Sequence, residues 1–252
     1  MAGTWVDGVL GAGLDGSDPG LTRGWNVFET FRSYGPTPFR LDEHVVRLQM
    51  SRAAVDIPLS EGVTQRLLER VEPDSWHRIT LTRGGQEVIT VAPIDPAYVG
   101  CERRVACVGW TALPGLPGTV KHGSRLHWQA AATHLGVDEV LLVAPDGAIL
   151  EANRSNVIAV IGGVVVTPPL DGRQLAGVTR QAMLDAAREA GLPVEEAPLP
   201  SFARFDELYL CSTLKELAPV VELDGRPGPG AGPIGDRLHA AFRALVAREA
   251  QA

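Results

Sequence analysis

The amino-acid sequence predicts an α/β protein made of two domains. Segments in which β-branched and aromatic residues alternate with polar ones, as in strands, are interspersed with segments of helical periodicity along all 252 residues. Residues 111–119 read TALPGLPGT, and a stretch this rich in proline and glycine favours an interdomain linker. A chain of this length can bury two modest cores. We therefore predict a small N-terminal α/β domain at 1–110 and a larger C-terminal domain at 120–252.

The predicted N-terminal domain combines two helices with a set of strands. The segment 41–57 has apolar residues at roughly helical spacing, and Asp42 is placed to cap it. A second helix is predicted at 61–71. The alternating segments expected to form strands are 4–10, 26–34, 76–84, 87–93 and 103–110.

The predicted C-terminal domain contains further helices and strands. The helices at 123–136 and 177–192 contain Gly136 and Gly191, which are suited to ending them, and a last helix is predicted at 235–250. Strands are expected within 138–160, where a PDG turn separates them, within 162–170 and within 205–223.

Composition and charge exclude several classes of protein. The formal net charge of -7 and the pI near 5.4 argue against a general nucleic-acid binder, which would show a basic face. No apolar run approaches the roughly 20 residues of a membrane helix, and the N-terminal segment has no signal-peptide pattern, so we expect a cytoplasmic protein. The three cysteines and six histidines show no metal-ligand spacing. We expect free thiols and no metal site.

Lysine is the rare cation of this chain. Of the 23 lysine and arginine residues, only Lys121 and Lys215 are lysines. Arginine stays protonated in proteins, whereas a lysine amine can lose its proton, most readily when buried, and then attack a carbonyl to form an imine. By spacing alone, a stray surface lysine is the favoured interpretation of Lys121. Lys215, in TLKELAP, is interpreted as an ordinary exposed lysine.

Other polar features admit both a functional and a plain structural interpretation. The small-residue loop at Gly177 opens a helix, whose free N–H groups suit a phosphate, although most such starts are only helix caps. Glu151 lies between apolar strands, where an unpaired carboxylate is costly, or it is an exposed turn residue. His44 and Arg47 share one helix face, which is either functional or solvated. The hydroxyls of CSTLKE, residues 211–216, lie at a bend that could be a common turn.

Together these features describe the needs of pyridoxal phosphate. A lysine can hold the aldehyde as an imine, while backbone amides and Arg47 can hold the phosphate. A carboxylate can keep the pyridine nitrogen protonated, so that the ring acts as an electron sink. The combination predicts this cofactor.

The order of the motifs resembles that of the class IV aminotransferases, the fold-type IV pyridoxal-phosphate enzymes. This family includes branched-chain aminotransferases, D-amino acid aminotransferases and aminodeoxychorismate lyase. The resemblance covers most of the chain and is carried by NVFETFRSYG, PFRLDEHVVRL, VKHGSRL, DEVLLVAPDGAILEANRSNV, GVTRQAML and DELYLCSTLKELAPV. It implies a small N-terminal α/β domain, a larger C-terminal domain with a mixed, barrel-like sheet, and a homodimer.

The resemblance also implies roles for individual residues. Lys121 would be the Schiff-base lysine and would shuttle the substrate proton. The other implied cofactor contacts are Arg47, Val178, Thr179 and Thr213 on the phosphate, Glu151 on the pyridine nitrogen, and Asn156 in support.

Four residues bear on the substrate. Ser212 and Leu214 fall where family members contact the substrate carboxylate or the phosphate. D-amino acid aminotransferases typically have a tyrosine where Phe28 stands, and their carboxylate-trapping Arg and His are missing after the TRG strand here. Arg23 stands where aromatic residues are usual, and it is either a replacement carboxylate clamp or a surface arginine.

The resemblance implies an aminotransferase that moves an amino group between an amino acid and a 2-oxo acid. Because KHGSRL is close to the KHLNRL of some aminodeoxychorismate lyases, the alternative is a lyase that releases pyruvate from 4-amino-4-deoxychorismate and gives 4-aminobenzoate. A third hypothesis is a non-catalytic paralogue that only binds pyridoxal phosphate. The presence of Lys121, Arg47 and Glu151 argues against it.

Overall fold

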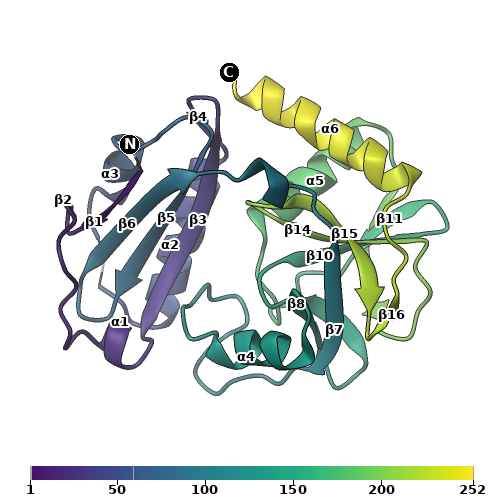
Figure 1. The fold of residues 1–252 in the computed structure, drawn as a ribbon, viewed down its shortest axis with the longest axis horizontal. Helices are drawn as coiled ribbons and strands as arrows, with labels where there is room; N and C mark the ends of the chain where they lie inside the picture. Colours follow the sequence, from purple (N-terminus) through teal and green to yellow (C-terminus); the bar gives the residue numbers. More distant parts are fainter. Residues whose placement is uncertain (1, 59, 252) are drawn as a thin grey trace. The chain divides into compact units, whose positions relative to one another are not determined.

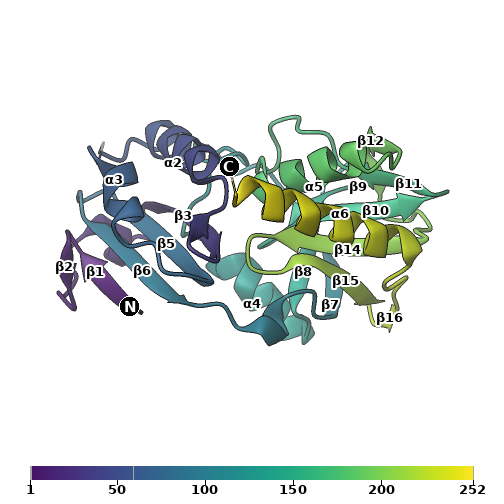
Figure 2. The same ribbon diagram turned by 90° about the horizontal axis from the view of Figure 1, so that it is seen from above.

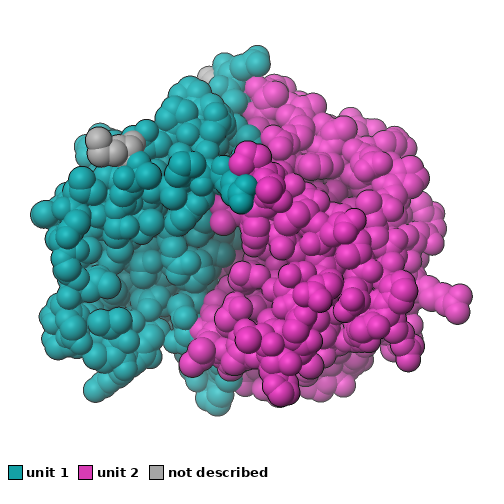
Figure 3. Space-filling view, in the orientation of Figure 1, with its two compact units in different colours: residues 1–95, 113–124, 249–252 teal, residues 96–112, 125–248 magenta. Residues whose placement is uncertain are grey.

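Two β-sheets organise the protein, each in its own part of the chain. The structure is a computed structural model and describes residues 2–58 and 60–251. The chain divides into two compact units, which Figure 3 colours separately. Unit 1 consists of Met1–Asp95, Leu113–Ser124 and Glu249–Ala252. Unit 2 consists of Pro96–Ala112 and Arg125–Arg248.

The bounds of the units differ from the predicted domain bounds at both ends of the linker. Strand β7 (Arg103–Gly109) pairs in parallel with β8 (Glu139–Val143) and with β15 (Glu216–Leu223), so it belongs to the second sheet. His122, in contrast, forms a β-bridge with Val27 of the first sheet. Pairing between distant segments decides these memberships, and local composition does not reveal it.

Unit 1 is an antiparallel sheet with one long helix on a face. The strand order is β2-β1-β6-β5-β3-β4. The long helix α2 packs along β3, as Figure 1 shows, and buries Leu48 against Phe31 and the neighbouring apolar side chains. The elements are β1 (Gly3–Val6), β2 (Val9–Leu10), α1 (Pro19–Thr22), β3 (Asn26–Tyr34), β4 (Thr37–Pro38), α2 (Leu41–Ala54), α3 (Val63–Leu68), β5 (Ser75–Thr82) and β6 (Glu87–Pro93).

Two local expectations for unit 1 are wrong in detail. The predicted strand 4–10 is a hairpin, because Asp7 and Gly8 both adopt positive φ and turn the chain between β1 and β2. Asp42 does not cap α2, because the helix already begins at Leu41. Arg40 is the N-cap residue and makes no side-chain cap hydrogen bond. Asp42 instead lies in the first turn, where its negative charge favours the helix dipole.

Unit 2 is built on a mixed ten-stranded sheet. The strand order is β12-β11-β10-β14-β15-β7-β8-β9-β13, with β16 beside β15. Figure 2 shows α5 and α6 running along this sheet, and β10 and β14 at its centre are buried almost throughout, as expected for strands covered on both faces. The remaining elements are η1 (Pro96–Tyr98), α4 (Leu126–Leu135), β9 (Ala148–Ala152), β10 (Asn156–Ile161), β11 (Val164–Thr167), α5 (Val178–Glu189), β12 (Val194–Glu196), β13 (Leu199–Pro200), β14 (Glu207–Ser212), β16 (Arg226–Pro227) and α6 (Pro233–Glu249).

The predicted helix ends of unit 2 agree with the structure. Gly136 caps α4 in the left-handed conformation, and α5 ends just before Gly191, which also has positive φ. All three cysteines are free thiols, as expected. None of the described helices combines the length and apolar composition needed to cross a lipid bilayer.

His77 is a buried titratable group in the core of unit 1. Its ring stacks on Phe31 with centroids 4.6 Å apart, and its Nε2 accepts the Glu72 N–H at 3.0 Å. Burial lowers the pKa of His77 from 6.5 to about 4. The neutral ring therefore belongs to the folded state, while the unfolded chain takes up a proton below pH 6.5.

We expect this histidine to weaken the fold in mild acid. Because the pKa of His77 is lower in the folded state than in the unfolded chain, the free energy of unfolding is unaffected above the unfolded pKa. As the pH falls below it, proton uptake by the unfolded chain lowers the free energy of unfolding, by about 2 kcal/mol at pH 5. His77→Gln keeps an acceptor for the Glu72 N–H but does not titrate. Urea unfolding at pH 7.5 and pH 5 should therefore show a smaller loss for the variant than for the wild-type protein. Equal losses would contradict the assignment.

Candidate active site

Lys121 is held by backbone bonds between a strand and a helix of unit 1. Its carbonyl accepts the Phe28 N–H of β3 at 3.0 Å, and its own N–H donates to the Ser51 hydroxyl of α2 at 3.1 Å. The Nζ atom lies 5.1 Å from the centre of the Phe28 ring. The lysine is half-buried, and its backbone is fixed while its side chain is partly accessible.

A buried ionic cluster lies beside this lysine. The Glu29 carboxylate, 1% exposed, accepts Arg47 Nε at 2.6 Å and Nη2 at 2.7 Å, which is a two-point pairing. His44 Nδ1 lies 2.9 Å from the same carboxylate. Because an ionised carboxylate can only accept, Nδ1 carries the proton. His44 and Arg47 thus line a buried face of α2, not a solvated one.

Burial and the neighbouring charges together set the protonation states of Glu29 and His44. Burial alone would raise the pKa of Glu29, but the charge and hydrogen bonds of Arg47, aided by His44 and Lys121, hold it far below its usual range. Burial also lowers the pKa of His44, to which the charges of Arg47 and Lys121 add. Glu29 is therefore an anion and His44 is neutral, with the Lys121 amine close enough to act on both.

Two basic side chains approach the Phe28 ring. The Arg78 guanidinium of β5 stands 3.7 Å from the centre of its ring, and Lys121 Nζ approaches the same ring. Cations are attracted to an aromatic face by its quadrupole. The ring thereby helps to fix the position of the lysine amine.

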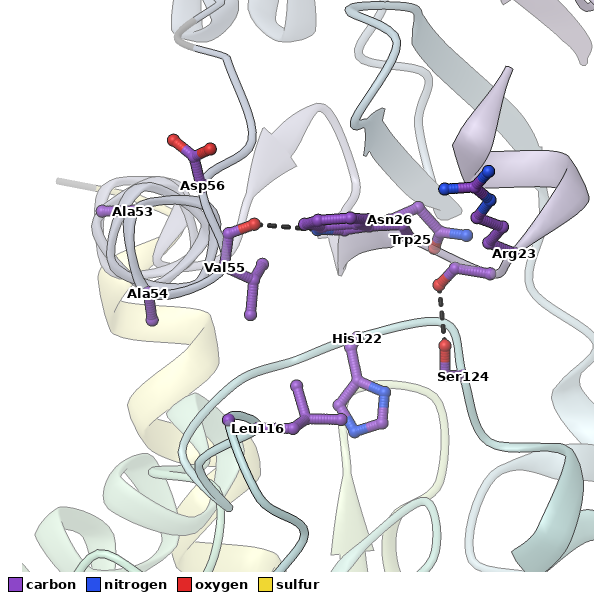
Figure 4. A pocket seen from close by; sticks show the side chains of 12 residues that line it. Arg23, Trp25, Asn26, Ala53, Ala54, Val55, Asp56, Leu116, His122 and Ser124 are labelled. Carbon is purple, nitrogen blue, oxygen red and sulfur yellow. Dashed lines mark hydrogen bonds between the residues drawn. The ribbon is translucent and has the colours of Figure 1, made fainter. Parts of the chain in front are cut away.

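Arg23 lines a cavity of about 450 Å³ in unit 1. Figure 4 shows Val55 and Leu116 at one side of this cavity, Arg23 at the other and His122 below. The Trp25 indole N–H donates to the Val55 carbonyl at 2.8 Å and so fixes the tryptophan. The cavity therefore combines apolar surface with the Arg23 guanidinium and other polar groups, among them the Asp56 carboxylate, and its lining includes His122, the residue after Lys121 in the chain.

In unit 2, Glu151 and Asn156 lie beside the start of α5. Glu151 Oε2 accepts the Leu175 N–H at 3.2 Å and Asn156 Nδ2 at 3.4 Å, while Asn156 Nδ2 also donates to the Leu175 carbonyl at 2.9 Å. Glu151 therefore has hydrogen-bond partners and is not simply an exposed turn residue. Donors of this kind stabilise the ionised form of a carboxylate.

The start of α5 requires a glycine. A Cβ atom at Gly177 would clash with the Asn156 Oδ1 atom, so only glycine allows this approach. The N-cap residue is Gly177 itself, with no side-chain cap bond, and Val178 and Thr179 in the first turn are buried. Backbone N–H groups at such a start favour an anion.

Ser212, Thr213 and Leu214 lie at the turn between β14 and β15. Cys211, near the end of β14, pairs with Asn156 at the start of β10. The turn therefore begins next to Asn156. Ser212 pairs with Glu216, whose positive φ closes the tight turn. Unit 2 thus gathers the turn and the Glu151–Asn156 pair at the same strand ends.

The interpretation of Lys215 as an exposed lysine is wrong. Its side chain is 3% exposed, and its Nζ lies 2.6 Å from Glu139 Oε1. The partner is 76 residues earlier in the chain, and no local pattern announces it.

Sequence reasoning also missed Glu29 and Arg78. Glu29 is buried in β3, and a buried carboxylate demands a cation partner. Arg47 on α2 is that cation, and its presence in the sequence is the signal that could have indicated the pair.

Comparison with known protein families identifies the chain. The family described as Amino-transferase class IV matches residues 26–223. The chain belongs to the class IV aminotransferases. It is an enzyme that moves an amino group between an amino acid and a 2-oxo acid, and enzymes of this class use pyridoxal 5′-phosphate. The family, the activity and the cofactor predicted from the motifs are confirmed.

Similar proteins cover almost the whole chain. The branched-chain-amino-acid aminotransferase of Escherichia coli K12 is 29% identical over 92% of this chain and 87% of its own length. The D-alanine aminotransferase of Listeria monocytogenes (strain 10403S) is 28% identical over 94% of this chain and 92% of its own length. The lyase alternative finds no support in these relatives.

A solved structure shows the same fold. The branched-chain aminotransferase of Thermoproteus uzoniensis, crystallised with norvaline, is 26% identical, covers 98% of this chain and 96% of its own length, and has a TM-score of 0.85. The small antiparallel sheet and the large curled sheet match the fold-type IV architecture, so the predicted fold class is confirmed.

We expect the loss of Arg47 to destabilise unit 1 strongly. Arg47→Met leaves Glu29 buried without its main partner, which should cost about 3–5 kcal/mol at pH 7. In the variant, uncompensated burial would raise the pKa of Glu29. The difference in unfolding free energy between the variant and the wild-type protein should therefore become smaller towards pH 5, as the carboxyl takes up its proton. Urea unfolding at the two pH values measures both effects.

Arg66→Met is the matched control. Arg66 pairs with Glu87 through the same two nitrogens at 2.7 Å, but its side chain is 31% exposed. We expect a loss of only about 1 kcal/mol for this variant. Equal losses for both variants would show that burial of the Glu29 pair is irrelevant.

Proposed function

We propose that this aminotransferase acts on aliphatic amino acids, with Lys121 as its covalent and catalytic residue. The observation that carries the proposal is the placement of Lys121: its backbone is fixed by β3 and α2, while its amine faces the aromatic ring of Phe28 and adjoins the Glu29 cluster. The relatives support the substrate class, because they are a branched-chain and a D-alanine enzyme and a structure with bound norvaline.

Lys121 performs two tasks in this proposal. Its neutral amine would hold the cofactor aldehyde as an imine, with loss of water, which a permanently charged arginine cannot do. Once the substrate amine has replaced it there, the freed Nζ atom would take up the proton of the substrate Cα and give it back to the cofactor. The cofactor, when bound, supplies an electron sink for the bond that is broken.

Arg47 and the α5 start are proposed to bind the cofactor phosphate. The pairing with Glu29 orients the Arg47 guanidinium and keeps its charge in a buried position. In unit 2, Val178 and Thr179 are the first two residues of α5 and offer backbone N–H groups and the Thr179 hydroxyl. Thr213, just after β14, adds a second hydroxyl. These donor sets have the chemistry that a phosphate dianion requires.

Glu151 is proposed to keep the pyridine nitrogen protonated, with Asn156 in support. The Leu175 N–H and the Asn156 amide both donate to one oxygen of the carboxylate, which orients the group and favours its ionised form. An ionised carboxylate next to the ring nitrogen favours the protonated ring.

Four residues are proposed to contact the substrate. Arg23 carries the only guanidinium among the residues of the described cavity lining, and a guanidinium can bind a carboxylate by two parallel bonds. The Phe28 ring gives an apolar wall next to Lys121. Ser212 and Leu214 flank Thr213 at the β14–β15 turn and complete the set.

We also propose that the enzyme is a homodimer of the cytoplasm. The family resemblance supports the dimer, and three free thiols suit a reducing compartment. Sedimentation of the holoenzyme checks the oligomeric state.

The spectral half-reaction tests the function. Holoenzyme is mixed with one amino acid at a time, including valine, leucine, norvaline and both alanine enantiomers. We expect the visible band of the bound cofactor to disappear and pyridoxamine phosphate to form with at least one of them. If none changes the spectrum, the proposed substrate class fails.

The substitution of Lys121 tests its role. Lys121→Ala should lower turnover by about 10³-fold or more, because both the covalent bond and the proton transfer are lost. Some cofactor should remain bound through its phosphate, but borohydride should no longer fix it to the chain. Lys121→Arg is the matched control, since it keeps a cation without the imine chemistry and should be equally inactive. Substantial activity in either variant would refute the assignment.

The substitution of Arg23 tests the carboxylate contact. Arg23→Ala should raise the KM for the amino acid by about 10-fold or more and change kcat little, because a charged hydrogen bond is lost from binding. Arg83→Ala is the control, since Arg83 stands 5.5 Å from the Trp25 ring and pairs with exposed Asp56. Equal KM values for the two variants would remove Arg23 from the site.

A further inference from the structure

The second lysine of the chain forms a buried ion pair in unit 2. Lys215 Nζ lies 2.6 Å from Glu139 Oε1, and the two side chains are 3% and 0% exposed. The amine also lies over the Tyr98 ring, with Nζ 5.7 Å from the ring centre. The Lys215 carbonyl also accepts the Gly100 N–H at 2.9 Å, so both the backbone and the side chain of this residue are fixed.

Stability alone does not explain such a pair. Removing two ions from water costs several kcal/mol for each, and apolar residues of similar size often give an equally stable or more stable protein. A buried ion pair does, however, impose one relative position on the segments that carry it, because a displaced partner leaves an uncompensated charge. The segments that this pair joins are therefore informative.

Glu139 connects two turns of unit 2. Its Oε1 binds Lys215 at the β14–β15 turn, and its Oε2 accepts the Ser155 hydroxyl at 2.8 Å in the β9–β10 turn. Ser155 directly precedes Asn156, whose amide donates to Glu151. One carboxylate thus ties the turn of Thr213 to the turn that leads into the Glu151–Asn156 pair.

We propose that Lys215 is a positioning residue: its ion pair with Glu139 holds the β14–β15 turn so that Thr213 meets the cofactor phosphate. The inference rests on the proposed function, in which Thr213 is a phosphate contact. Lys215 itself touches neither cofactor nor substrate. Its effect is specific to the phosphate end of the cofactor, whereas a merely structural ion pair affects every ligand and the fold alike.

The test compares two ligands that differ by the phosphate. Apoprotein is titrated with pyridoxal 5′-phosphate and with pyridoxal, and the absorbance of the bound chromophore gives each Kd without turnover. For Lys215→Met we expect the Kd of the phosphorylated ligand to rise by about 10-fold or more, as for the loss of a hydrogen bond to a charged group. The Kd of pyridoxal should change by less than about 3-fold. Equal changes for the two ligands, or none, would overturn the inference.

Two further variants separate positioning from stability. Lys215→Met/Glu139→Gln keeps an acceptor for Ser155 and removes the unpaired charge, so its thermal midpoint should recover while its affinity for pyridoxal 5′-phosphate stays low. Recovery of that affinity together with stability would overturn the inference. Leu245→Ala, in the buried face of α6, is the destabilised control and should leave the ratio of the two Kd values unchanged.

The outcome for the wild-type protein distinguishes the two levels of the proposal. Wild-type protein that binds pyridoxal 5′-phosphate together with an unaffected Lys215→Met variant overturns the positioning role alone. Wild-type protein that binds no pyridoxal 5′-phosphate overturns the proposed function and this inference with it. The double variant gives the decision if Lys215→Met does not fold.

Discussion

A carboxylate removed from water can stay ionised only where cations and donors surround it, and this constraint shapes the candidate site residues within each unit. Glu29 fixes Arg47 and His44 on α2 and lies close to the Lys121 amine. Glu139 joins two turns of the second sheet. In each case the carboxylate specifies the positions of its neighbours, because any displacement leaves a buried charge uncompensated.

The two lysines show how environment divides one chemistry into two roles. Lys121 is half-buried and stands over an aromatic ring, with its backbone fixed from both sides. Lys215 is enclosed, and its amine lies 2.6 Å from a Glu139 carboxylate oxygen, so it is not accessible to a ligand as a nucleophile. The amine that we propose to react is the more accessible of the two, and the enclosed amine is the one that we propose to position a turn.

Sequence patterns predict the features that depend on local chemistry. The strand expected at 26–34 and the glycine that ends α4 needed nothing beyond the neighbouring residues, and both agree with the structure. The membership of β7 and the burial of Lys215 depend on partners far away in the sequence. Lys121 and Glu151 were singled out because several motifs occur in a known order, whereas Glu29 is one of several polar residues in its strand and nothing local marks it as buried. Long-range pairing is therefore what single-sequence reasoning could not supply.

The start of α5 shows how one missing side chain serves two requirements. The glycine of GVTR could be explained by the close approach of a phosphate to the backbone. The structure gives a second cause, since Asn156 already occupies the space where a Cβ of Gly177 would stand. The Asn156 amide in turn donates to Glu151 and to the Leu175 carbonyl that precedes the helix. The absence of a side chain at Gly177 therefore sets the distance between the carboxylate proposed for the ring nitrogen and the helix start proposed for the phosphate. A larger residue there would disturb both ends of the cofactor contact at once.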